Sequence, residues 1–320
     1  MSRRIVLAAA QLGPIQLADD RKVAVDRMLA LLADANRRGA EFVVFPELAL
    51  TTFFPRWWQD DKAWADRFFE TAMPSNETAP LFEAARRYRI GFHLGYGELT
   101  PEGRHFNTAI LVSPAGEIFL KYRKIHLPGH DDHRPQRKVQ NLEKRYFEVG
   151  DLGFPVIRAP MGKLDGANFG TMICNDRRWP EAWRVLGLQS VEVVALGYNT
   201  PAANTTNEGF EAHHLRVEHS HLSIRAGCYQ NACYGVGTAK AGTEDGNEMF
   251  GHSIIVNPQG EIVAMADSWD DQLITHEADL ESCTFGRTTI FNFAAHRRPE
   301  HYKRITDQVG AEPPPAWERG

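Results

Sequence analysis

Strand-like and helix-like segments alternate along almost the whole chain, and this alternation most constrains its fold. Short apolar runs such as Ile5–Ala10 and Glu41–Phe45 indicate buried strands. The segment Ala18–Arg38 repeats apolar residues at helical spacing and is followed by a glycine, which is typical of a helix and its end. Because each segment has an apolar face to bury, the mixture predicts an α/β domain.

The same pattern continues to the end of the chain. Turn sequences such as Ser113–Glu117 and Asn257–Gly260 join neighbouring strands, so antiparallel hairpins and mixed sheets are expected. Strands are expected at Ile90–Leu99, Phe106–Val112, Ile118–Tyr122, Gly170–Cys174, Val191–Leu196, Ala232–Gly237, His252–Val256, Glu261–Ala266 and Leu273–Asp279, and helices at Thr78–Tyr88, from about Trp179, and at Glu211–Gly227.

No internal repeat or low-complexity linker divides the chain, so residues 1–303 are interpreted as one domain. Residues 304–320 contain three consecutive prolines and are expected to be a peripheral tail or an oligomer contact. A net charge of −5 argues against nucleic acid as a partner. No apolar run approaches the roughly 20 residues that a membrane helix needs, so no membrane partner is expected.

The first residues resemble a twin-arginine export signal, but the apolar stretch stops at Gln11 and no cleavage site follows. They are therefore interpreted as the first strand of a cytoplasmic protein. The four cysteines include no C-x-x-C pair, so reduced thiols are expected rather than a disulfide framework.

Motifs that indicate a bound cofactor or metal are absent from the sequence. It has no phosphate-binding loop, no complete dinucleotide fingerprint and no H-E-x-x-H helix. The histidines His213, His214, His219 and His221 are interpreted as polar or site-facing residues of a helix rather than as metal ligands. We therefore expect neither a metal nor an organic cofactor.

Three places stand out because a charged or reactive residue follows an apolar strand, where open α/β sheets bind their ligands. These residues are Glu47 after Pro46, Lys124 in the segment Lys121–Pro128, and Cys174 before two arginines. The neighbouring positive charge favours the thiolate of Cys174.

Each place also has an ordinary interpretation. Glu47 could be a solvated loop residue, the lysines could protect an edge strand, and Cys174 could be a buried structural thiol. Together, however, the three supply a carboxylate base, a lysine and a thiol, which is a set suited to covalent catalysis.

These motifs resemble the Glu-Lys-Cys triad of the nitrilase superfamily of carbon–nitrogen hydrolases. The likeness rests on Pro46-Glu47, Arg123–Leu127 and Cys174–Glu181, and it extends from Ile5 to about Tyr302. Within that superfamily, the N-carbamoyl-D-amino acid amidohydrolases are similar over longer stretches, namely Phe45–Trp57, Lys121–His130, Leu142–Glu148, Cys174–Arg184 and Gly197–Pro201.

The resemblance implies a four-layer α-β-β-α sandwich of two mixed sheets, assembled as a homodimer or homotetramer. It implies that Glu47 is the general base, that Cys174 is the nucleophile, and that Lys124 and the backbone N–H of Asn175 stabilise the oxyanion. Glu143 matches a family carboxylate that orients Lys124. His126 and, less closely, His219 match histidines that hold the geometry of the site.

The expected reaction is hydrolysis of an N-carbamoyl-D-amino acid to the D-amino acid, ammonia and carbon dioxide. Arg177 and Arg178 follow the nucleophile closely, and Arg pairs with an α-carboxylate in a bidentate manner. Asn199 and Thr200 are candidates to complete this carboxylate site.

The chain departs from the subfamily pattern in two places. Asn141 replaces a histidine, and the loop over residues 202–210 differs, so the side-chain preference stays open. Two alternatives remain: an amidase acting on a β-ureido acid, an N-carbamoyl amine or a simple amide, and an inactive homologue with a binding or regulatory role.

Overall fold

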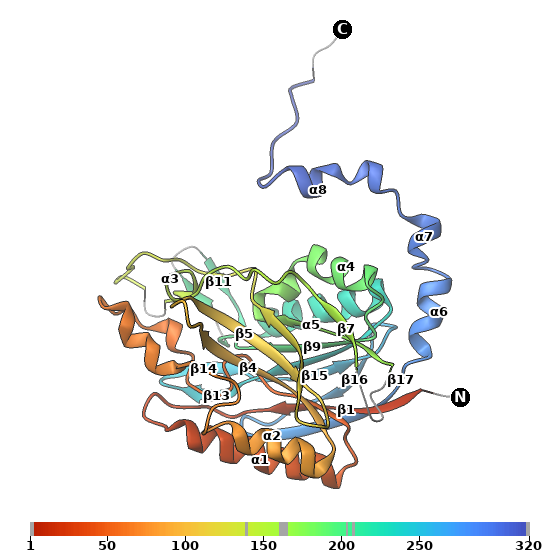
Figure 1. Cartoon of the computed structure of the whole chain (residues 1–320). Coiled ribbons are helices and arrows are strands. Elements are labelled where there is room, and N and C mark those ends of the chain that lie inside the picture. Colours follow the sequence, from red (N-terminus) through yellow and green to blue (C-terminus); the bar gives the residue numbers. More distant parts are fainter. Residues whose placement is uncertain (1–2, 138–139, 160–165, 203, 207–208, 318–320) are drawn as a thin grey trace.

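Two large sheets of the computed structural model form the centre of the fold, in which residues 3–137, 140–159, 166–202, 204–206 and 209–317 are described (Figure 1). The first sheet has the strand order β17-β1-β2-β4-β5-β6, and β3 pairs with β4. Its pairs are both parallel and antiparallel. The strands are β1 (Arg4–Gln11), β2 (Phe42–Val44), β3 (Phe69–Glu70), β4 (Gly91–Leu99), β5 (His105–Val112), β6 (Ile118–Arg123) and β17 (Gln272–Asp279).

The second sheet has the order β16-β15-β12-β9-β8-β7 and is also mixed. Its strands are β7 (Val156–Arg158), β8 (Asn168–Ile173), β9 (Val193–Tyr198), β12 (Tyr234–Ala239), β15 (Ile254–Val256) and β16 (Ile262–Met265). Two separate hairpins lie outside both sheets, one of β10 (Asn204–Thr206) and β11 (Gly209–Glu211), the other of β13 (Ala241–Glu244) and β14 (Asn247–Phe250).

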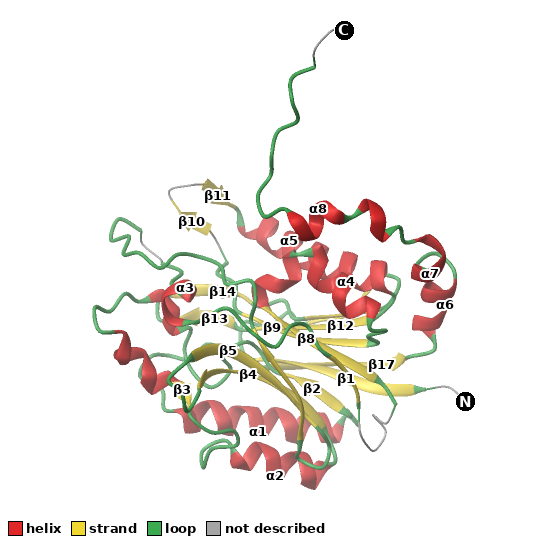
Figure 2. Ribbon diagram, turned by 45° about the horizontal axis from the view of Figure 1, so that its top comes forward, coloured by secondary structure: helices red, strands yellow, loops and turns green. Residues whose placement is uncertain are grey.

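Helices cover the outer face of each sheet, which confirms the expected α-β-β-α sandwich (Figure 2). Helices α1 (Arg21–Arg37) and α2 (Ala79–Tyr88) lie against the first sheet, and α4 (Pro180–Leu188) and α5 (His213–Asn231) against the second. The one-turn helix α3 (Glu143–Tyr146) packs on an aromatic cluster that includes Phe54. In the described part of the chain, no helix combines the length and apolarity needed to cross a membrane.

Strand β1 shows how alternation along a strand builds two cores. Ile5, Leu7 and Ala9 belong to the cluster that fills the space between the sheets. Ala8 and Ala10 belong to the cluster beneath α1 and α2. Because successive side chains point to opposite faces of a strand, a central strand of this sandwich is apolar on both faces.

The chain ends in an arm that leaves the body of the molecule (Figure 1). It consists of α6 (Ser282–Thr288), α7 (Phe293–His296) and α8 (Lys303–Asp307), with a further turn at Pro299–His301. Cys283 is buried in α6, whereas α7 and α8 have no buried residue.

The main strands and helices lie within a few residues of their predicted positions, but the sequence analysis missed both small hairpins. One had a usable signal, since Asp245 and Gly246 occupy a two-residue turn between β13 and β14 with φ values of 47° and 76°. Asp-Gly is a preferred sequence for a turn in which both residues have positive φ. Cys174 was also predicted as the end of a strand, but it begins a 3₁₀ turn, Cys174–Arg178.

Candidate active site

The backbone of Glu47 lies between the two sheets, three residues after the end of β2. A Cβ atom added to Gly95 on β4 would lie 2.9 Å from the Cα of Glu47, and one added to Gly197 on β9 would lie 2.5 Å from its backbone nitrogen. Only glycine permits such close backbone approach at both positions. The two sheets therefore meet at the residue predicted to be the base.

The carboxylate of Glu47 is completely buried and accepts three hydrogen bonds. Its Oε1 accepts from Lys124 Nζ at 2.7 Å and from Asn107 Nδ2 at 2.8 Å. Its Oε2 accepts from the backbone N–H of Asn199 at 3.0 Å. These bonds come from both sheets, so the position of the carboxylate is set by the whole sandwich.

Lys124 lies directly after β6 and binds two carboxylates. Its Nζ donates to Glu47 and, at 2.5 Å, to Glu143 Oε2 on α3. Burial opposes the charge, but the anionic forms of Cys174, Glu143 and Glu47 outweigh it and raise the pKa of Lys124. Burial also raises the pKa of Glu143, against the effect of Lys124. The lysine is thus held as a cation.

Cys174 follows β8 and has a strained backbone. Its φ of 48° lies in the left-handed region, which non-glycine residues rarely adopt. Its Sγ donates to the carbonyl oxygen of Asn199 at 3.7 Å. Burial raises the pKa of Cys174, and Glu47 adds to that shift while Lys124 and Arg177 oppose it. The thiol is therefore protonated near neutral pH, and a nucleophilic role requires a base.

The buried carboxylate of Asp176 organises the turn that begins at Cys174. Its Oδ2 accepts from the Tyr122 hydroxyl at 2.7 Å and from the backbone N–H of Ile173 at 3.0 Å. Its Oδ1 is 2.8 Å from Nδ1 of His126, whose ring stacks on Trp179 at 5.0 Å. Asn175 Nδ2 donates to the carbonyl oxygen of His126 at 3.1 Å. The structure therefore links His126 to the nucleophile turn rather than placing it against the Cys174 sulfur.

Arg177 is almost fully buried beside the nucleophile. Its guanidinium donates from Nη1 to the carbonyl oxygen of Cys174 at 2.6 Å and from Nη2 to Thr200 Oγ1 at 3.2 Å. It also donates from Nε to Ser220 Oγ and lies over the ring of Tyr198. Within the described residues, no carboxylate lies within ion-pairing distance of it.

Arg178 is exposed, and the charge of Arg177, together with desolvation, lowers its pKa to about 10. A third arginine, Arg216 on α5, donates from Nε to the carbonyl oxygen of Pro201 at 2.7 Å and from Nη1 to Glu211 at 3.0 Å. The same glutamate lies 2.5 Å from Nδ1 of His219, which is half-exposed. Through Glu211, His219 is thus linked to Arg216, which with Arg177 and Arg178 forms the arginine group.

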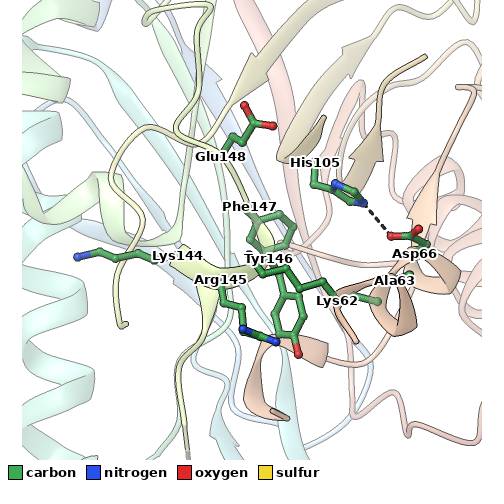
Figure 3. A pocket seen from close by; sticks show the side chains of 10 residues that line it. Lys62, Ala63, Asp66, His105, Lys144, Arg145, Tyr146, Phe147 and Glu148 are labelled. Carbon is green, nitrogen blue, oxygen red and sulfur yellow. Dashed lines mark hydrogen bonds and ion pairs between the residues drawn. The ribbon is translucent and has the colours of Figure 1, made fainter. Parts of the chain in front are cut away.

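The outer side of α3 borders a separate surface pocket of about 380 Å³ (Figure 3). His105 and Asp66 form an ion pair of 2.8 Å on its wall, and Lys144 and Glu148 also line it. None of the predicted site residues lines this pocket.

A sequence model of the carbon-nitrogen hydrolase family matches residues 6–288. The chain belongs to this family. A nitrilase from Pyrococcus abyssi (strain GE5 / Orsay) is 29% identical over 305 residues, which cover 94% of this chain and 100% of that protein. An N-carbamoylputrescine amidase from Solanum lycopersicum is 26% identical over 321 residues, with 98% of each chain covered.

Solved structures of other members share the fold of this carbon-nitrogen hydrolase. A carbon-nitrogen hydrolase from Helicobacter pylori G27 has a TM-score of 0.80 at 24% identity, covering 95% of this chain and 99% of the other. A mutant amidase from Nesterenkonia sp. AN1, with the acetamide moiety of fluoroacetamide added at its active-site cysteine, has a TM-score of 0.66 at 19% identity and covers 92% and 97%. The family establishes an amide hydrolase of the nitrilase superfamily.

Several residues of this hydrolase's site were not assigned a role from sequence. Asn107 lies 60 positions from Glu47, and Arg216 lies far from the nucleophile motif. Asp176 had a signal, because an aspartate two residues after a candidate nucleophile is well placed to accept N–H groups of its own turn. At Asn141, which replaces the subfamily histidine, Oδ1 accepts from the backbone N–H of Glu143 at 3.4 Å.

The histidines of α5 in this hydrolase point to different neighbours. His213 packs near the Trp269 ring, and His221 lies 3.1 Å from the carbonyl oxygen of His252. Across the residues that the structure describes, no group of three or more His, Cys, Asp or Glu side chains is arranged to hold a metal ion. Residues 203, 207 and 208 of the divergent loop lie outside the described residues.

Proposed function

We propose that this hydrolase cleaves N-carbamoyl-D-amino acids to the D-amino acid, ammonia and carbon dioxide. The observation that carries the proposal is the Arg177 guanidinium, buried beside Cys174 with no carboxylate partner among the described residues. Burying a cation without an anion is costly, and a substrate α-carboxylate would supply the missing charge. Arg178 and Arg216 add positive charge around the same place.

In the proposed reaction, Glu47 takes the proton of the Cys174 thiol and the thiolate attacks the carbamoyl carbon. Lys124 Nζ and the backbone N–H of Asn175 stabilise the oxyanion. The C–NH₂ bond breaks, and Glu47 returns its proton to the leaving ammonia. Water, deprotonated by Glu47, then hydrolyses the S-carbamoyl intermediate. The released N-carboxy amino acid loses carbon dioxide without further help.

The arginines also bear on the choice of isomer. A carboxylate bound at Arg177, close to the carbamoyl group bound at Cys174, fixes two of the four substituents of Cα. The hydrogen and the side chain of Cα then take the remaining two positions, and the two isomers differ in which group takes which. A pocket with room for the side chain at only one of these positions selects the D isomer.

N-Carbamoylputrescine is the second candidate substrate, because relatives named N-carbamoylputrescine amidase match this chain over nearly its full length. Its distal ammonium would need a free carboxylate. Glu211 lies near the arginine group but already pairs with Arg216 and His219. Three arginines disfavour a cation at this position, so we rank this substrate second.

The test is an ammonia-release assay on N-carbamoyl D- and L-amino acids, 3-ureidopropionate, N-carbamoylputrescine and an uncharged carbamoyl or amide analogue. Arg177→Lys and Arg178→Lys, made separately, are expected to lower kcat/KM for N-carbamoyl-D-amino acids about tenfold or more in at least one case. Because Arg177 also holds the carbonyl of Cys174, the informative readout is the ratio of the losses on charged and uncharged substrates. Equal losses on both, or a wild-type preference for N-carbamoylputrescine, would overturn the assignment.

A further inference from the structure

A second buried ionic cluster lies outside the catalytic residues, along strand β13 from the residue before it to its last residue. It consists of Arg56, Lys240 and Glu244, all buried. Glu244 Oε1 accepts from Arg56 Nη2 at 2.7 Å, and its Oε2 accepts from Lys240 Nζ at 3.0 Å. The mechanism above uses none of these three side chains.

The cluster holds the segment that follows Glu47. Lys240 Nζ donates to the carbonyl oxygen of Thr51 at 2.5 Å, and the backbone N–H of Phe53 donates to Glu244 Oε1 at 2.7 Å. Leu48 has a φ of 45°, so the chain turns sharply immediately after Glu47. The course of the chain beyond that turn is therefore fixed by side chains of the hairpin.

The same hairpin also holds the loop that contacts the Glu47 carboxylate from the other sheet. The backbone N–H of Ala202 donates to the carbonyl oxygen of Glu248 at 2.7 Å, and that of Phe250 donates to the carbonyl oxygen of Thr200 at 3.2 Å. Asn199, next to Thr200, donates its backbone N–H to Glu47. One hairpin thus contacts both loops on which the placement of Glu47 depends.

We propose that the Arg56–Glu244–Lys240 cluster is a positioning device that fixes the Glu47 carboxylate relative to Asn199 and Cys174. The proposal rests on the proposed role of Glu47 as the base. A buried ion cluster is a poor way to gain stability, because desolvation opposes it and apolar side chains of similar volume often stabilise a fold better. Its directional bonds restrain the loop in a way that apolar contacts do not.

The test uses Lys240→Met and Arg56→Met. Each leaves one buried cation paired with Glu244, whereas removal of Glu244 would leave two unpaired cations. We expect either variant to lower kcat about tenfold or more, with KM changed less than about threefold. The matched control is Arg3→Met, which breaks the Arg3–Glu192 ion pair of 2.8 Å at the opposite end of β9 from Asn199. For this control we expect kcat within about twofold of wild type.

A double-mutant cycle separates positioning from a general structural role. In a Glu47→Gln background there is no carboxylate base left to position, so adding Lys240→Met is expected to change kcat less than about twofold. The rate of Cys174 alkylation by iodoacetamide is a second readout, with the same expectation. An equal loss in both backgrounds, or wild-type kcat in the single variants, would overturn the proposal. If neither methionine variant folds, the same double-mutant cycle is measured with Thr52→Val in place of Lys240→Met. This substitution removes a hydroxyl that donates to Asp245 at 2.6 Å, and the same outcomes support or overturn the proposal.

Failure of the base role gives a different result. Wild-type kcat in Glu47→Gln alone would overturn the proposed mechanism whatever the cluster does. A large loss in Glu47→Gln together with control-like behaviour of Lys240→Met and Arg56→Met would overturn only the positioning role.

Discussion

Glycines at positions 95 and 197 allow the backbone of Glu47 to lie between the two sheets. A methyl group at Gly197 would come within 2.5 Å of the Glu47 backbone nitrogen, so β9 or Glu47 would have to move. The same displacement would disturb the bond from Asn199 to the Glu47 carboxylate. At the residue scale, the position of Glu47 thus depends on two residues without side chains.

We expect Gly197→Ala to lower kcat at least about tenfold and to destabilise the fold by about 1–3 kcal/mol, as overpacking a filled site typically does. Gly310→Ala is the control, because a Cβ there meets nothing within 4 Å. Steady-state kinetics and thermal unfolding measure the two effects. Unchanged kcat in Gly197→Ala would show that Glu47 tolerates the shift.

Cys174→Ala is expected to abolish turnover while the far-UV spectrum and Tm stay close to those of wild type, since alanine removes only the sulfur. Iodoacetamide labelling at Cys174, followed by peptide mass spectrometry, should track the loss of activity. Alanine at Cys228, Cys233 or Cys283, which are buried and are not assigned a role in the reaction, should leave appreciable activity. Turnover by Cys174→Ala above the level of contamination would contradict covalent catalysis by this thiol.

At the scale of elements, ion pairs join strands β4 and β6 of the first sheet across β5, which lies between them. Glu98 on β4 accepts from Lys121 Nζ at 2.6 Å and Arg123 Nε at 2.9 Å on β6, and from Thr108 Oγ1 at 2.8 Å on β5. Burial would raise the pKa of Glu98, but these hydrogen bonds outweigh it and lower the pKa to about 2. The charged carboxylate is therefore the form that holds the three strands together.

Because the pKa of Glu98 is depressed in the folded state, its stabilisation is present at pH values above its unfolded pKa and is lost as the pH falls toward 2. The shift corresponds to at most about 3 kcal/mol. Urea unfolding of wild type and Glu98→Gln at a series of pH values should show a difference in free energy that is largest above about pH 5 and disappears near pH 2. A difference independent of pH would contradict this role.

At the scale of the whole molecule, the C-terminal arm and the outer helices leave apolar residues exposed. Phe285, Ile290 and Ile305 on the arm have exposed fractions of 64%, 58% and 60%. Leu188 on α4 and Leu222 on α5 are exposed at 45% and 53%. Exposed apolar surface of this extent is typical of an interface between subunits.

We expect the full chain to form a homodimer or homotetramer and a chain ending at Thr289 to form a smaller species. Light scattering after size-exclusion chromatography measures both masses. The shortened chain should keep a cooperative thermal unfolding transition, since α7 and α8 contribute no buried residue. An unchanged oligomer after the truncation would show that the arm is not required for assembly.

The boundary between a domain of residues 1–303 and a tail of residues 304–320 stays a prediction.

Much of the fold could be predicted from the sequence, because strand and helix periodicity and turn signals are local properties of the chain. The positions of Glu47, Lys124 and Cys174 were predictable for the same reason, since each directly follows a strand or lies in a short motif. The β13–β14 hairpin was missed, although Asp245-Gly246 is a preferred sequence for its two-residue turn.

Local sequence patterns were thus enough to predict the layered architecture, the family and the grouping of Glu47, Lys124 and Cys174. The residues around these three became visible only in the folded chain: Asn107 and Asn199 on Glu47, Asp176 on His126, and the buried cluster around Glu244. Most of these contacts join residues 50 to 190 positions apart. Local periodicity indicates which face of a segment is buried. It does not indicate which distant side chain will hydrogen-bond to the polar groups of that segment, because these partners come together only when the two sheets pack.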